Sequence, residues 1–245
     1  MLLAIALAPR APAQTTLRLA AAADLQPVLP PILEQFRQST GTRVETTYQA
    51  SAMLTTQIMN GAPFDVFFSA DLGYPKRLID ANLADGPAPI TYAKGTLVLW
   101  TRSDSALPQP SLDLLRNPRP KRLAIANPER APYGRAAVAA LNKLNLYDSL
   151  KSRLVTAENI AQAGQFADSG NADAGLISLT AAMTPRMASE GAYFVIPSDL
   201  YPPIEQGAVI VSKTQQRDQA RKLLDFLLSA PVQAQLAKSG LTPVH

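Results

Sequence analysis

The sequence lacks cysteine altogether, and its one histidine, His245, is the last residue. Without cysteine the chain can form no disulfide bond, no thiolate metal site and no lipid anchor on a cysteine side chain. A histidine at the chain terminus is poorly placed to act as a general acid or base. The phosphate-binding loop, the Gly-x-Gly-x-x-Gly turn, the Gly-x-Ser-x-Gly elbow and the His-Glu-x-x-His zinc motif are also missing. The sequence therefore gives no evidence for an enzyme, and we expect a binding protein with no cofactor and no metal site.

The chain is also poor in charge and in long apolar runs. Its net charge is only +4 over 245 residues, and no cluster of lysine and arginine with interleaved aromatic residues occurs. The usual signature of a nucleic-acid-binding surface is therefore missing. After the N-terminus, no apolar run approaches the roughly 18 residues that a membrane-spanning helix requires. We expect neither a nucleic-acid partner nor direct membrane insertion.

Residues 1–13 have the features of a short secretory signal peptide. Residues 2–8 form an apolar core, and the Ala-Pro-Ala sequence at 11–13 has the small-x-small pattern that precedes a cleavage site. The positively charged segment that normally comes before the apolar core is missing. The sequence predicts an exported protein whose mature chain begins near Gln14, and the absence of cysteine is compatible with the periplasm.

Strand-like and helix-like patterns alternate along the rest of the chain, which predicts an α/β architecture. Alternating or β-branched apolar residues mark the strands, and apolar residues three or four apart mark the helices. Pro27, Pro30 and Pro31 interrupt the first helical pattern, so that helix should start late or be kinked. The expected strands lie near 17–23, 44–48, 66–68, 95–101, 122–126, 175–178 and 207–211, and the expected helices near 25–36, 51–58, 76–81, 135–144, 160–167, 220–228 and 229–240.

Several expected strands end in a short turn that opens a helix with a small or capping residue. The first turn of a helix leaves about four N–H groups unpaired and carries a partial positive charge. Several such turns facing one cleft would hold an oxyanion with neutral dipoles. Each turn taken singly is common, so this pattern alone predicts only an α/β protein that could bind an anion. The turns are Asp24-Leu25, Ser51-Ala52, Tyr133-Gly134 and Asn159-Ile160.

The segments around these turns carry a wider resemblance. They are AAAADL (20–25), GAPFDVFFSAD (61–71), NPERAPYGRAA (127–137), GNADAGLI (170–177), YPPIEQGAVIV (201–211) and DFLLSAPVQAQLAKSGL (225–241). Together they resemble the periplasmic molybdate-binding proteins of ABC importers. Each motif alone is weak, but the resemblance covers essentially the whole mature chain, in order and with matching spacing.

This resemblance implies the type II periplasmic-binding-protein fold, in which two α/β lobes joined by crossover strands close over a ligand. Lobe one would comprise residues 14–95 and 205–245, and lobe two residues 96–204. The crossovers would be the segment GTLVLWT (95–101) and the stretch around 205–211. A discontinuous first lobe would also explain why the sequence shows no flexible linker.

The resemblance further implies a substrate-binding component that holds molybdate or tungstate and delivers it to the membrane permease of an ABC importer, and we expect it to be a monomer. Family members hold the anion with hydroxyl groups and with backbone amides at helix starts. In this sequence the matching positions are Asp24, Ser51, Tyr133, Ile160 and Ser178. Ser51 would contribute its hydroxyl, whereas Tyr133 and Ile160 would contribute their amides.

Two of these positions depart from the residues that are usual in the family. Asp24 stands where a serine is common, and an ionised carboxylate there would repel a dianion. Its side chain either turns away to cap its own helix or accepts a proton that the ligand carries. Ser178 stands where some members have a tyrosine, and the shorter side chain would widen the pocket or admit a water molecule.

Other interpretations remain open from the sequence. Asp24 would suit hydrogen phosphate on the same fold, and sulfate shares the tetrahedral shape of molybdate. An enzyme built on this fold would need an acid or base in the cleft, for which Asp24 is the only clear candidate. A ferric-binding protein would need adjacent tyrosines, and a transcriptional sensor would need a helix-turn-helix segment; the sequence shows neither.

Overall fold

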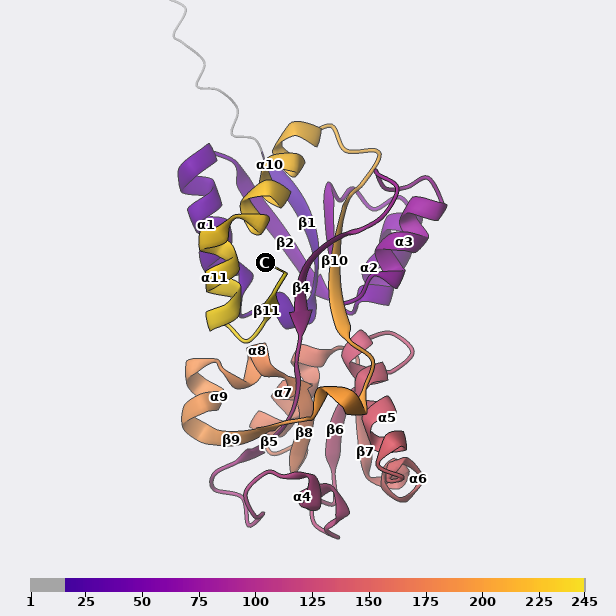
Figure 1. The fold of residues 1–245 in the computed structure, drawn as a ribbon, viewed down its shortest axis with the longest axis vertical. Coiled ribbons are helices and arrows are strands. Elements are labelled where there is room, and N and C mark those ends of the chain that lie inside the picture. Colours follow the sequence, from indigo (N-terminus) through magenta and orange to yellow (C-terminus); the bar gives the residue numbers. More distant parts are fainter. Residues whose placement is uncertain (1–15, 245) are drawn as a thin grey trace, which may run out of the picture.

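The computed structural model describes residues 16–244 and arranges them as two lobes, each built around a mixed β-sheet (Figure 1). This confirms the predicted two-lobe α/β class, while the expected signal segment 1–13 lies outside the described residues. In spatial order, the strands of lobe one are β11 (Thr242–Pro243), β4 (Ile90–Gly95), β10 (Ile204–Ile210), β3 (Val66–Ser69), β1 (Thr16–Ala22) and β2 (Arg43–Gln49). Those of lobe two are β7 (Leu154–Ala157), β6 (Leu123–Ala126), β8 (Ala174–Ser178), β5 (Leu97–Arg102) and β9 (Gly191–Val195).

Helices cover both faces of the sheet in lobe one, because its strands send alternate side chains to opposite faces. Along β1, Leu17 and Leu19 pack into one apolar cluster, whereas Ala20 between them and the end of the strand packs into another. The first cluster includes side chains from α1 (Leu29–Thr40), α10 (Arg217–Leu228) and α11 (Ala230–Lys238). The second includes side chains from α2 (Ser51–Met59) and α3 (Gly73–Asp80), which lie on the other side in Figure 1.

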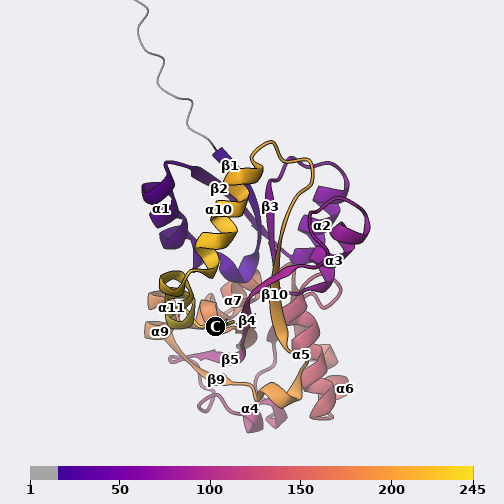
Figure 2. The same cartoon turned by 45° about the horizontal axis from the view of Figure 1, so that its top comes forward.

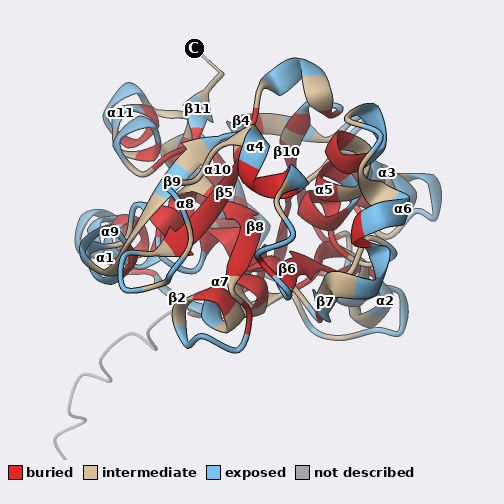
Figure 3. Ribbon diagram, turned by 90° about the horizontal axis from the view of Figure 1, so that it is seen from below, coloured by how far each residue is buried: buried red, intermediate tan, exposed pale blue. Residues whose placement is uncertain are grey.

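Among the described residues, the apolar cluster of lobe two also reaches Ala22, Ala23, Ala50 and Ala70 of lobe one, and its central strands β5, β6 and β8 are buried (Figure 3). Trp100 on β5 is fully buried, and its Nε1–H donates to the carbonyl oxygen of Met187 at 3.2 Å. None of the described helices is long and apolar enough to cross a membrane. The helices of this lobe are α4 (Leu112–Arg116), α5 (Pro132–Lys143), α6 (Tyr147–Leu150), η2 (Lys151–Arg153), α7 (Ile160–Asp168), α8 (Leu179–Ala182), α9 (Pro185–Glu190) and η3 (Ser198–Leu200).

The chain passes between the lobes twice, between β4 and β5 and again before β10. Strands β4 and β10 pair antiparallel and run side by side toward the waist in Figures 1 and 2. The segment GTLVLWT is therefore not the crossover strand that was expected: from Leu97 onward it is β5, paired with β8 and β9 inside lobe two. The crossover strand is β4, which the sequence pattern did not predict because ITYAKG mixes polar and apolar residues without regular alternation. These crossings support the proposed division into 14–95 with 205–245 and 96–204.

Helix α1 begins at Leu29, which confirms the prediction that the prolines delay its start. Pro30 and Pro31 lie in its first turn, where the amide that proline lacks has no partner within the helix in any case. The helix ends at Gly41, whose φ of 74° is the left-handed conformation that glycine adopts without strain. A 3-10 turn, η1 (Ala23–Leu25), connects β1 to this helix and carries Asp24.

The two lobes also touch each other away from the crossover strands. Arg135 of α5 forms an ion pair with Asp71 of lobe one, and its guanidinium lies 3.2 Å from the hydroxyl of Tyr74. The backbone N–H of Ala52 in α2 donates to the carbonyl oxygen of Arg130 at 3.2 Å. The Ala52 bond joins the start of α2 to the loop that precedes α5, and the Arg135 contacts join α5 itself to lobe one.

Candidate functional site

A small pocket lies between the lobes, where four strands end. Strands β1 and β2 are parallel, and so are β6 and β7, so the carboxyl ends of each pair open onto one region. This is the place where open α/β sheets bind ligands. The segments that follow these strands line a pocket of about 190 Å³. The pocket brings together four of the five predicted site residues, two from each lobe: Asp24, Ser51, Tyr133 and Ile160.

Three helices begin at the wall of this pocket and present their first amides to it. They are α2, α5 and α7, with 9, 12 and 9 residues. Within residues 16–244, the N–H groups of Ser51, Tyr133 and Ile160 donate to no other group of the chain. A helix N-terminus combines such unpaired donors with a partial positive charge. Three of them around one pocket favour a small anion.

Local sequence explains why two of these helices begin where they do. In α5, Pro132 occupies the first position, where its fixed φ suits the helix and its missing N–H costs nothing. The next glycine, Gly134, packs against the end of β6, since a Cβ there would lie 2.3 Å from the carbonyl oxygen of Ala126. In α7, the side chain of Asn159 accepts from the N–H of Gln162 at 3.0 Å and caps the helix.

Ser51 is the first residue of α2, and its side chain is buried. Its Oγ accepts a hydrogen bond from the backbone N–H of Ala70 at 3.1 Å. A serine hydroxyl has one proton and can accept as well as donate. Because the Ala70 amide uses an acceptor position, the hydroxyl proton of Ser51 remains available to a bound ligand.

The Asp24 carboxyl group is buried and does not cap its own helix, which sets aside the capping interpretation weighed from the sequence. Its Oδ2 accepts from the hydroxyl of Tyr133 at 3.2 Å and from Nε2 of Gln206. Burial raises the pKa of Asp24 to about 6, and the hydrogen bonds from Gln206 and Tyr133 offset part of that rise. Its Oδ1 is buried without a hydrogen-bond partner among the described residues.

The pocket contains donors but no positive side chain. Its lining comprises small apolar residues, Gln49, Asn159 and the four predicted site residues, with no lysine or arginine. Residues 16–244 also contain no group of histidine, aspartate and glutamate side chains that could hold a metal ion. The arrangement can therefore bind a small anion through neutral dipoles and a hydroxyl.

Residues 17–242 match the family described as bacterial extracellular solute-binding proteins. The chain belongs to this family. The molybdate-binding protein ModA of Azotobacter vinelandii is 39% identical to it over 210 residues, which are 86% of this chain and 83% of that protein. Its counterpart in Rhodobacter capsulatus is 38% identical over 192 residues, or 78% and 74% of the two chains.

A solved structure agrees with these sequence relatives. The periplasmic molybdate-binding protein of Azotobacter vinelandii superposes on this solute-binding protein with a TM-score of 0.88 at 31% identity, over 94% of this chain and 100% of that one. The comparisons confirm the predicted resemblance and the two-lobe fold. They also place the chain among proteins that bind a solute outside the cytoplasm and are not enzymes.

Sequence reasoning missed two residues of this solute-binding protein that hold Asp24 in place. Gln206, on β10, is fully buried, and its Oε1 accepts from the hydroxyl of Tyr92 at 2.8 Å while its Nε2 donates to Asp24. Gly95 makes room for the same cluster, since a Cβ there would lie 2.2 Å from the hydroxyl oxygen of Tyr133. Gln206 lies in the segment YPPIEQGAVIV, and Gly95 begins the expected crossover segment GTLVLWT, but no sequence pattern indicated that either residue belongs to the cluster around Asp24.

Ser178, the fifth predicted residue, does not line the pocket with the other four. It lies on the other side of Asp24, in a separate hollow that also includes Ala181 and Gln26. Its Oγ accepts from the N–H of Ala181 at 3.3 Å, which caps α8, and lies 2.9 Å from Oγ1 of Thr180. The Thr180 hydroxyl in turn donates to the carbonyl oxygen of Asp24 at 2.8 Å. Ser178 is thus linked to the pocket through the backbone of Asp24.

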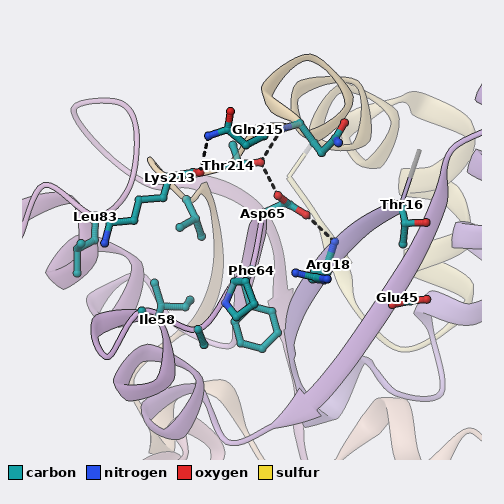
Figure 4. A pocket seen from close by; sticks show the side chains of 15 residues that line it. Thr16, Arg18, Glu45, Ile58, Phe64, Asp65, Leu83, Lys213, Thr214 and Gln215 are labelled. Carbon is teal, nitrogen blue, oxygen red and sulfur yellow. Dashed lines mark hydrogen bonds between the residues drawn. The ribbon is translucent and has the colours of Figure 1, made fainter. Parts of the chain in front are cut away.

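A larger hollow lies at the opposite end of lobe one, beside the start of β1 (Figure 4). One acidic group of its lining is held by neighbours: Asp65 accepts from the backbone N–H of Arg18 at 2.7 Å and from the hydroxyl of Thr214. It includes none of the predicted site residues, and only lobe one lines it. The candidate site is therefore the smaller pocket between the lobes, because its donors come from both lobes and from three helix starts.

Proposed function

We propose that this solute-binding protein holds molybdate, or tungstate, between its lobes and delivers it to the membrane permease of an ABC importer. The observation that carries the proposal is the convergence of three helix N-termini and the Ser51 hydroxyl on one pocket without a basic side chain. Such donors hold a small oxyanion without a salt bridge. The likeness to molybdate-binding proteins supports molybdate over other tetrahedral anions.

In this proposal the amides of Ser51, Tyr133 and Ile160 donate to the oxyanion, and Ser51 adds its hydroxyl. Asp24 forms the remaining polar wall of the pocket. Ser178 acts at one remove, because its hydrogen bonds support α8 and Thr180 rather than the pocket itself. Closure of the lobes is required, since Ser51 belongs to lobe one and the other two amides to lobe two.

Hydrogen phosphate is the second candidate, and one observation favours it. The buried Oδ1 of Asp24 has no partner among the described residues, so an ionised Asp24 could accept the proton of a protonated anion. Fully ionised molybdate offers no such proton. The two candidates therefore make opposite demands on Asp24.

Calorimetric titration of the protein with molybdate, tungstate, sulfate and phosphate tests the proposal, and native mass spectrometry gives the stoichiometry. We expect one molybdate or tungstate per chain, bound at least about tenfold more tightly than sulfate or phosphate, a difference of about 1.4 kcal/mol. Tight binding of phosphate with no binding of molybdate would overturn the choice of ligand. Binding of none of the four anions would overturn the function.

We also infer that residues 1–13 direct export to the periplasm and that the protein acts as a monomer. The apolar segment and the Ala-Pro-Ala pattern support export, and the family to which the chain belongs is extracellular. N-terminal sequencing of the exported protein should begin near Gln14. Light scattering of the same material should give the mass of one chain, with and without molybdate.

A further inference from the structure

The two oxygens of the Asp24 carboxyl group have different surroundings. Oδ2 receives two donors, the hydroxyl of Tyr133 and Nε2 of Gln206. Oδ1 is equally buried, but no described residue donates to it or accepts from it. Asp24 lines the pocket beside Ser51 and Ile160. The carboxyl group is therefore held by one oxygen, and the other has no hydrogen-bond partner among the described residues.

Among residues 16–244, no positive side chain pairs with Asp24. Tyr133 faces it from α5, Gln206 from β10 and Tyr92 from β4, all of them neutral at physiological pH, because burial raises the pKa of both tyrosines far above their usual value. From α8 the Thr180 hydroxyl donates to the backbone carbonyl of Asp24, and from β2 the pocket receives Gln49; both are neutral.

A second acidic side chain, Asp168, lies near Asp24. Asp168, at the end of α7, lines the hollow on the far side of Asp24 and is paired there with Arg186. An ionised Asp24 would consequently meet an oxyanion with no cation between them, and the two would repel strongly in this buried site.

We propose that Asp24 binds the oxyanion as the neutral acid, with a proton on Oδ1 that it donates to the ligand, so that binding takes up one proton. This inference rests on the proposed function. Oδ2 already accepts from two donors, so the proton resides on Oδ1, where it meets an acceptor only when the oxyanion is bound. The group that repels a dianion when ionised then becomes a third kind of donor, beside the amides and the serine hydroxyl.

The expected pH dependence follows from burial of the carboxyl group. Burial raises the pKa of Asp24 to about 6 in the free protein. A bound dianion favours the protonated form and raises that pKa further. Below about pH 6 the proton is already present and affinity is constant; above it, affinity should fall by about tenfold for each pH unit, because one proton must be taken up.

The test is calorimetry with sodium molybdate at about pH 6 and about pH 8, in buffers of different ionisation enthalpy, which counts the protons taken up. We expect the wild type to take up close to one proton at the higher pH and fewer at the lower. Asp24→Asn keeps an acceptor for Gln206 and Tyr133 and offers an N–H₂ donor in place of the Oδ1 proton. It should bind molybdate with no proton uptake, equally at both pH values, and more tightly than the wild type at the higher one.

Glu129→Gln is the matched control, because it removes an exposed acid from the loop before α5 and should keep the wild-type pH profile. Equal wild-type affinity at both pH values with no proton uptake would overturn the inference and leave the proposed function standing. Proton uptake of the same size in Asp24→Asn would also overturn it, because the ligand would then carry the proton. Loss of molybdate binding in a folded Asp24→Asn would overturn the inference too. If that variant fails to fold, the number of protons that the wild type takes up decides whether the inference stands. Absence of molybdate and tungstate binding at every pH would instead refute the proposed function.

Discussion

Replacing Ser51 by alanine should remove one donor from the bound oxyanion and leave the amides in place. The Ser51 side chain is buried, and its Oγ already accepts from the N–H of Ala70, so the lost group is a desolvated hydroxyl with its proton free for the ligand. A hydrogen bond to a charged partner in such a site contributes about 1.5–3 kcal/mol. Affinity for molybdate should fall by about 10- to 150-fold. Folding stability should also fall by about 1–3 kcal/mol, because the Ala70 amide loses its acceptor.

Titration calorimetry of Ser51→Ala and wild type measures the loss of affinity, and urea denaturation without ligand measures the loss of stability. Ser178→Ala is the matched control: that hydroxyl is also buried and also accepts from a backbone N–H, but it lies outside the pocket. It should lower stability by about 0.5–2 kcal/mol, the usual cost of removing a cap, with little change in affinity. Equal losses of affinity in the two variants would refute the assignment of Ser51 as a direct ligand.

Three further predictions concern the surroundings of the pocket. Arg135→Ala should speed the release of molybdate by up to about fivefold in stopped-flow measurements. The reason is that a partly exposed ion pair with Asp71 contributes about 0.2–1 kcal/mol to closure of the two lobes. An unchanged release rate would show that the pair does not hold the lobes together. Gly95→Ala should displace the Tyr133 hydroxyl and cost about 1–3 kcal/mol in urea denaturation, and a stability equal to wild type would contradict the packing. Burial raises the pKa of Asp24 from 3.8 to about 6, so the free energy of unfolding of the free protein should fall by about 3 kcal/mol as the pH rises between those two values. Asp24→Asn should abolish this fall. The same fall in the variant would assign it to another group.

The sequence predicted the helix starts around the candidate site well. Capping residues act on their own neighbours, so Asn159 marks the start of α7 locally, whereas Ser51 begins α2 without a cap bond and accepts instead from the distant Ala70 amide. The prolines before and within α1 act locally, as Asn159 does. The strand that crosses between the lobes was harder, because Ile90–Gly95 is half-buried at the waist and its polarity does not alternate regularly.

The role of Asp24 shows where local signals stop. An aspartate that follows a strand and precedes a helix has the local pattern of a cap, and the sequence left capping and ligand contact as alternatives. The structure instead pairs its carboxyl group with Tyr133, more than a hundred positions later, and with Gln206, on the second crossover strand. Ser178 shows the converse, since it matches a family contact but caps α8 behind the pocket.

By itself, the sequence determined the α/β class, the helix starts that present free amides, the absence of catalytic motifs and the family to which the chain belongs, because all of these depend on neighbouring residues or on the order of motifs along the chain. Only the tertiary structure decided which of those helix starts share a pocket, that no basic side chain enters it, and that Asp24 is buried with one oxygen free. Those properties depend on how two lobes close and on which distant side chains exclude water, and a carboxyl group's proton affinity follows from that burial rather than from its neighbours in the chain.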